Sequence, residues 1–189
     1  MRTDELMTLP AGLPVPVDDG ACEHLPGTVV PPIGLVATDG SVVRLDAPFE
    51  GWTVVFAYPR TGEPDRDPPG GLAAWDAIPG ARGCTPQACA YRDHHAELRA
   101  AGARVFGLST QETDYQREMA ERLELPFPVL SDERRELAHA VGLPTFEHAG
   151  LTLFKRHTLV IRDGRIEHVF YPVFPSDRDA AQVLDWLRA

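Results

Sequence analysis

The chain has 189 residues, of which 43% are hydrophobic and 24% are charged, as is typical of a soluble globular domain. Its formal net charge of −10 argues against nucleic acid or an anionic membrane as a partner. No stretch approaches the run of about 18 apolar residues that spans a membrane. Three cysteines and no signal-peptide pattern argue against a secreted disulfide framework, so we expect a cytoplasmic location.

Residues 1–32 are rich in proline and glycine, and we expect them to form an extended, irregular arm. Cys22 lies in this arm, two residues before His24. A Cys-x-His pair is half of a metal site, and the sequence offers no second half at ligand spacing. We therefore interpret Cys22 as structurally incidental and expect no metal.

Residues 33–189 predict one α/β domain with a mixed sheet and helices on both faces. Strands are expected where β-branched and aromatic residues cluster between turn signals. These are a hairpin of 33–37 with 42–45, a buried strand at 52–58, strands at 104–108 and 126–130, and a hairpin of 158–161 with 165–171.

Four helices are expected from apolar residues at helical spacing. They cover 86–101, 112–123 after an N-cap at Ser109-Thr110, a helix capped by Ser131-Asp132 that ends at Gly142, and 177–187. Residues 60–82 are dense in proline, glycine and aspartate, and predict a loop-like insertion with a short helix near 72–78.

The stretch GCTPQAC, from Gly83 to Cys89, carries the clearest chemical signal. Thr85 followed by Pro86 is a helix-start signal, which places Cys84 at a helix N-terminus. Free backbone N–H groups and the positive end of the helix dipole favour a thiolate there, and the thiolate is the nucleophilic form of cysteine. The alternative is that both cysteines simply fill a core, as free cysteine often does.

Four stretches of the chain, in order, resemble the peroxiredoxin branch of the thioredoxin fold, closest to the bacterioferritin-comigratory (Q-type) group. They are VVFAYP, GCTPQACAYRD, ARVFGLSTQ with LPFPVLSDERRELAHAVGL, and KRHTLVIRDGRIEHVFY. The resemblance implies a thioredoxin-like fold and a thiol-dependent peroxidase that reduces hydrogen peroxide or small organic hydroperoxides. It also implies thioredoxin or a similar dithiol as reductant and no cofactor, and we expect a monomer or homodimer.

This resemblance assigns roles to single residues. Cys84 matches the peroxidatic cysteine, which attacks the peroxide O–O bond and becomes a sulfenic acid. Cys89 matches the resolving cysteine, and Arg156 matches the arginine that holds the thiolate and polarises the peroxide. Tyr58 and Pro59 match the aromatic residue and the proline that face the pocket.

The sequence departs from the family pattern next to Cys84. Ala81 stands where the family has a threonine three residues before the cysteine, and Gln87 stands where the closest group usually has a glutamate. Thr61, beyond the buried strand, is our candidate to restore the missing hydroxyl. Gly83 and Thr85, which flank the cysteine, are expected to line the substrate pocket.

Helix geometry separates Cys84 and Cys89 too far for a disulfide. Five residues of helix give about 7.5 Å of rise and a Cα separation of about 8.6 Å. A disulfide requires a Cα separation of less than about 7 Å. We therefore expect the first helical turn to unwind before the bridge closes.

Two other functions stay open on the sequence alone. One is a thiol–disulfide oxidoreductase on the same scaffold, although dithiol oxidoreductases of this fold use Cys-x-x-Cys rather than Cys-x4-Cys. The other is a redox sensor or binding module, which Ala81 and the insertion favour.

Overall fold

The computed structural model describes residues 6–189. Within them, the strands of a seven-stranded sheet are β1 (Gly34–Ala37), β2 (Val42–Arg44), β3 (Trp52–Ala57), β4 (Ala103–Ser109), β5 (Val129–Ser131), β8 (His157–Arg162) and β9 (Arg165–Phe170). Their order across the sheet is β2-β1-β5-β4-β3-β8-β9. Strands β3, β4 and β5 run parallel to one another, and β1, β2, β8 and β9 make antiparallel pairs. The predicted mixed sheet and both predicted hairpins are confirmed.

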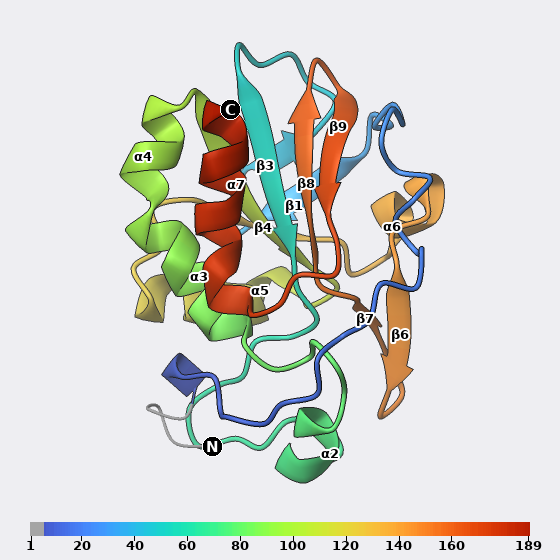
Figure 1. The fold of residues 1–189 in the computed structure, drawn as a ribbon, viewed down its shortest axis with the longest axis vertical. Helices are drawn as coiled ribbons and strands as arrows, with labels where there is room; N and C mark the ends of the chain where they lie inside the picture. Colours follow the sequence, from blue (N-terminus) through green and yellow to red (C-terminus); the bar gives the residue numbers. More distant parts are fainter. Residues whose placement is uncertain (1–5) are drawn as a thin grey trace.

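Helices cover both faces of this sheet (Figure 1). They are α2 (Leu72–Asp76), α3 (Cys84–Asp93), α4 (His95–Ala100), α5 (Thr113–Arg122), α6 (Glu136–Val141) and α7 (Asp179–Arg188), with a 3-10 turn, η1, at Ser176–Arg178. Strand β3 shows why: Val54 and Phe56 pack with α3, α4, α5 and α7, whereas Val55 and Ala57 pack with α6. Alternate side chains of a strand point to opposite faces, so a continuous apolar run is buried on both.

The helix predicted over 86–101 is wrong in its bounds. Helix α3 already begins at Cys84, with Gly83 as its N-cap, so Thr85 is not the cap and Pro86 is the third helical residue. The left-handed backbone of Gly83 (φ 105°) turns the chain into the helix two residues earlier than the Thr-Pro signal indicates. His94 leaves the helical conformation and divides the predicted helix into α3 and α4.

Two predicted helix caps differ from the structure. The N-cap of α5 is Glu112, and the Ser109 hydroxyl instead accepts the backbone N–H of Gln111. Helix α6 begins at Glu136, yet the Asp132 carboxylate still accepts two of its free N–H groups, those of Leu137 and Ala138. Gly142, in the left-handed conformation, ends α6 as predicted.

The sequence did not lead us to predict a second, two-stranded sheet. Strands β6 (Thr145–His148) and β7 (Leu151–Phe154) form an antiparallel hairpin around Ala149 and Gly150, which both have positive φ. Alanine is not a usual residue at such a turn, so the signal was weak. Strand β7 leads directly into Lys155 and Arg156 and so delivers the arginine to the site.

Residues 6–17 of the arm and the insertion lie together beyond the carboxyl end of β3, in the lower part of Figure 1. The insertion carries the short helix α2, as predicted. The arm is irregular, but Cys22, Leu25 and Val30 are buried in the core beside α6. A boundary at residue 33 between arm and domain stays a prediction. Among the described residues, no helix is both long and apolar enough to cross a membrane.

Candidate active site around Cys84

The sheet places Tyr58 and Arg156 side by side at the same end of two neighbouring strands. Strands β3 and β8 pair antiparallel with Ala57 opposite His157, so the residue after β3 and the residue before β8 leave the sheet side by side. Ligands of open α/β sheets bind beyond the carboxyl ends of parallel strands, and Tyr58 and Arg156 lie at the carboxyl end of β3.

Cys84 is the first residue of α3 and is only 4% exposed. The turn before it requires glycine, because a Cβ on Gly83 would lie 2.3 Å from the Ser176 hydroxyl oxygen. That hydroxyl donates to the Gly83 carbonyl at 2.8 Å. The 3-10 turn η1 therefore fixes where α3 starts, and with it the position of the sulphur.

Arg156 is the charged neighbour of Cys84. Its Nη2 lies 3.2 Å from the Cys84 Sγ. The same guanidinium donates to three successive carbonyls at the end of the insertion, at 3.1 Å to Gly80, 3.0 Å to Ala81 and 3.3 Å to Arg82. A buried cation held in this way stabilises negative charge on the sulphur.

Ala81, which stands at the position of the family's threonine, contacts Cys84 through its backbone. The Ala81 carbonyl oxygen is 3.6 Å from the Cys84 sulphur. The hydroxyl of Thr61 donates to the Gln111 side chain at 3.2 Å, and the Thr61 N–H donates to the same oxygen at 2.8 Å. Among the described residues, no hydrogen bond joins Thr61 to Cys84. The structure therefore differs from the hypothesis that Thr61 supplies a hydroxyl to the sulphur, because this hydroxyl bonds Gln111 instead.

Gln87 and Asp179 extend the site inward. The Gln87 Oε1 accepts a hydrogen bond from Arg156, and its Nε2 donates to Asp179 at 2.7 Å. Tyr91 and Thr158 donate to the same Asp179 oxygen, at 3.0 and 2.7 Å. Burial raises the pKa of Asp179, against the effect of these donors. The sequence interpretation missed Asp179 and Ser176, which lie about ninety residues from Cys84 and match no local motif.

The remaining predicted pocket residues have different surroundings, and among the described residues neither Cys84, Tyr58 nor Thr85 lines the pocket that opens on Arg156. Tyr58 is fully buried and donates to Gln116 at 2.6 Å. Burial raises the pKa of Tyr58 well above its usual range, and the nearby Cys84 acts in the same direction. Thr85 is buried in the first turn of α3, and Pro59 lines the pocket that opens on Arg156.

Cys89 lies on the same unbroken helix as Cys84, and both are free thiols. It is buried in the apolar cluster that contains Phe56 and Met119. Burial is the main cause that raises the pKa of Cys89. In this helical state the two cysteines are in the arrangement that the sequence predicts to need unwinding before a disulfide forms.

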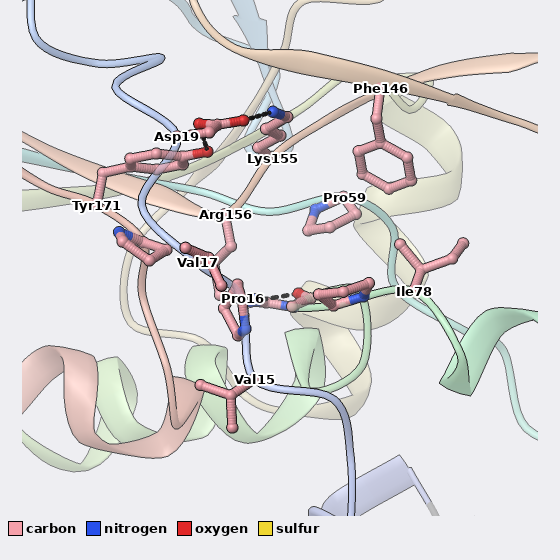
Figure 2. A pocket seen from close by; sticks show the side chains of 13 residues that line it. Val15, Pro16, Val17, Asp19, Pro59, Ile78, Phe146, Lys155, Arg156 and Tyr171 are labelled. Atoms are coloured by element: carbon pink, nitrogen blue, oxygen red, sulfur yellow. Dashed lines mark hydrogen bonds and ion pairs between the residues drawn. The ribbon is translucent and has the colours of Figure 1, made fainter.

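A pocket of about 340 Å³ opens on Arg156. Apolar side chains form most of its wall, with one part from the arm and the other from the segment after β3, the insertion and β6: Val15, Pro16, Val17, Pro59, Ile78 and Phe146 (Figure 2). The arm is fastened there by Asp19, which pairs with Lys155 and accepts the Tyr171 hydroxyl at 2.6 Å. Within residues 6–189, no three His, Cys, Asp or Glu side chains gather as a metal site would need.

Known proteins are similar to this chain in sequence and in fold. The family model described as Redoxin matches residues 25–184. Peroxiredoxin Bcp of Escherichia coli (strain K12) is 33% identical over 167 residues, which make up 86% of this chain and 94% of that protein. Peroxiredoxin Q, chloroplastic, of Gentiana triflora is 28% identical over 97% of this chain and 78% of its own length.

Solved structures agree with these relatives. The crystal structure of peroxidoxin BcpB from Mycobacterium tuberculosis matches with a TM-score of 0.70 at 28% identity, over 87% of this chain and 97% of that one. The α/β thioredoxin-like fold that the resemblance implied is thereby confirmed.

Proposed function

Because this chain belongs to the redoxin family and is a peroxiredoxin, a thiol-dependent peroxidase, we propose that Cys84 is its nucleophile, Arg156 its charge-stabilising residue and Cys89 its resolving thiol. The observation that carries the proposal is the 3.2 Å contact between the Arg156 guanidinium and the Cys84 sulphur at a helix start. Family membership favours the peroxidase over the thiol–disulfide oxidoreductase and the redox-sensing module.

The first step is attack of the Cys84 thiolate on the terminal oxygen of a hydroperoxide. A sulphur–oxygen bond forms while the O–O bond breaks, so the sulphur is oxidised and the peroxide is reduced. The leaving alkoxide or hydroxide takes up a proton and departs as an alcohol or water, and Cys84 becomes a sulfenic acid. Arg156 stabilises the negative charge as it moves from sulphur to the leaving oxygen.

The second step uses Cys89. Its sulphur attacks the Cys84 sulphur, an S–S bond forms, and the sulfenic oxygen leaves as water with the Cys89 proton. Thioredoxin or a similar dithiol then reduces the bridge by exchange and is itself oxidised. Unwinding the first turn of α3 both shortens the distance between the cysteines and opens the apolar surroundings of Cys89, which favours its thiolate.

The shape of the pocket bears on the substrate. Hydrogen peroxide needs no apolar wall, whereas the carbon chain of an organic hydroperoxide gains free energy by burial against one. The pocket wall is mostly apolar and ends at Arg156, which reaches the sulphur. We propose small organic hydroperoxides as the preferred substrates, with hydrogen peroxide reduced more slowly.

Compartment and assembly follow as lesser parts of the proposal. A pair of free cysteines that must be reduced in every cycle suits a reducing compartment such as the cytoplasm. We propose a monomer or homodimer, which light scattering after size-exclusion chromatography checks.

Rapid mixing of the reduced protein with peroxide tests the central step. Mass spectrometry of quenched samples follows the gain of one oxygen on Cys84 and then the loss of water as the disulfide forms. We expect fast oxidation in the natural protein, faster for an organic hydroperoxide than for hydrogen peroxide. Cys84→Ser should abolish peroxide consumption with the fold retained.

Cys22→Ser is the matched control, since it removes the buried thiol outside the site and should leave the rate unchanged. Peroxide consumption by the Cys84→Ser variant at the natural rate would contradict the choice of nucleophile. Slow oxidation of the natural protein by both peroxides would contradict the peroxidase mechanism and favour the redox sensor.

A further inference from the structure

Besides three backbone carbonyls, Arg156 bonds a side-chain amide, that of Gln87. A carboxylate presents an acceptor oxygen to an arginine whichever way it turns, but a glutamine presents oxygen at one end and NH2 at the other. Gln87 turns its oxygen toward Arg156. With the amide reversed, NH2 would face a guanidinium that has only donors, and this hydrogen bond of Arg156 would be lost.

Asp179 distinguishes the two orientations of the Gln87 amide. Its Oδ2 lies 2.7 Å from the Gln87 Nε2 and can only accept when ionised, so it fixes the NH2 end and leaves the oxygen for Arg156. The other two donors to this oxygen, the Tyr91 and Thr158 hydroxyls, come from α3 and β8. Three donors from two elements, α3 and β8, thus hold the carboxyl group in the core.

The cost of burying Asp179 is only partly offset. The residue is fully buried and three donors bond its Oδ2, but among the described residues its Oδ1 has no hydrogen-bond partner. The unpartnered oxygen costs stability, although removal of the carboxyl group would in turn leave three buried donors without this acceptor. The part of this arrangement that bears on the site is the orientation of the Gln87 amide toward Arg156.

We propose that Asp179 is a positioning residue of the peroxidase site, acting through the Gln87 amide to hold Arg156 against the Cys84 sulphur. The inference rests on the proposed roles of Cys84 and Arg156. It assigns to α7, whose first residue is Asp179, a part in setting the rate of a thiol on α3.

Asp179→Leu tests the proposal, because leucine fills the volume and removes the acceptor. We expect Cys84 oxidation by peroxide to slow by about tenfold or more, in line with the loss of a buried, charge-assisted contact. The melting temperature should fall, since the buried Gln87, Tyr91 and Thr158 donors lose this acceptor, so the rate is measured well below it. Asp179→Ala provides a second variant with the same expected rate.

Rescue separates positioning from a structural role. Gln87→Glu in the Asp179→Leu background gives Arg156 a carboxylate that needs no orientation, and the rate should return to within about threefold of the natural protein. Asp132→Leu is the matched control: it removes a buried carboxylate that accepts two N–H groups of α6 but has no bond to Arg156 or Gln87, so the oxidation rate should stay unchanged.

Three results would overturn the proposal: an unchanged rate in Asp179→Leu, a slowed rate that Gln87→Glu does not restore, or an equal slowing in Asp132→Leu. Failure of the peroxidase proposal looks different, because the natural protein would then itself react slowly with peroxide. The natural protein is therefore measured first in the same rapid-mixing experiment.

Discussion

Two buried cysteines, Cys22 and Cys84, lie in clusters on opposite faces of the same sheet and have opposite electrostatic surroundings. Cys22 has Asp18 and Asp19 nearby, and burial together with these two carboxylates raises its pKa to about 12. Cys84 is equally buried but has the Arg156 guanidinium 3.2 Å from its sulphur and stands at the open end of a helix.

The contrast shows that two equally buried thiols of this fold have different charged neighbours. A desolvated sulphur beside carboxylates stays a neutral thiol at neutral pH, because its thiolate would face like charge in a medium of low dielectric. Beside a fixed cation, the free-energy cost of placing charge on an equally buried sulphur is lower. The low dielectric of the core also strengthens each interaction that stabilises this charge.

Removing the cation from the Cys84 region should have the largest effect. In Arg156→Met the sulphur keeps its burial and loses its charged partner, so Cys84 should come to resemble Cys22. We expect peroxide oxidation to slow by about 100-fold, as for loss of a preorganised charge-stabilising donor. Arg104→Met is the control, since that half-buried arginine bonds Thr53 on another part of the sheet. Equal slowing in both variants would contradict the assignment.

Cys89→Ser sharpens the comparison by isolating the first step. The sulfenic acid on Cys84 should form at the natural rate and persist, because no thiol remains on α3 to condense with it. We expect thioredoxin-coupled turnover to fall by about tenfold or more while the single-turnover rate is kept. Dimedone labelling followed by mass spectrometry detects the trapped species. A disulfide between Cys84 and Cys22 in this variant would show that the two regions communicate.

Cys22→Ala should alter stability and not chemistry. The side chain is 5% exposed in the core beside α6, so its loss leaves a small cavity that lowers the free energy of unfolding by about 1 kcal/mol. Peroxide kinetics should not change. In the natural protein, iodoacetamide at pH 8 should label Cys84 before Cys22, and native Cys22 labelled as fast as Cys84 would break the comparison.

Acid should loosen the arm next to Cys22, with the smallest effect. Hydrogen bonds from Lys155 and Tyr171 lower the pKa of Asp19 from 3.8 to about 2. A folded-state pKa below the unfolded value means that the contact stabilises the protein above about pH 4 and is lost as the pH falls toward 2. We expect Asp19→Asn to lower the melting temperature slightly at pH 6 and not at pH 2. A difference that persists at pH 2, or one that Asp18→Asn reproduces, would argue against the contact.

Local sequence signals predicted regular structure well and boundaries less well. The apolar run from Trp52 predicted β3 because a strand buried on both faces needs apolar residues at every position. The start of α3 was placed two residues late, since the left-handed turn at Gly83 depends on the Ser176 hydroxyl, which local sequence does not show. The β6–β7 hairpin was missed because its turn begins with Ala149.

The candidate site also combines features that local sequence predicts with features that it does not. The sequence by itself determined the nucleophile candidate, because a cysteine at a helix start is a local pattern, and the resemblance added Arg156 and Cys89. Only the tertiary structure decided that Thr61 bonds Gln111, that three carbonyls of the insertion bond Arg156, and that the Gln87 amide bonds both Arg156 and Asp179. The reason is physical: a helix start depends on neighbouring residues, whereas the position of a buried charge depends on every element packed against it.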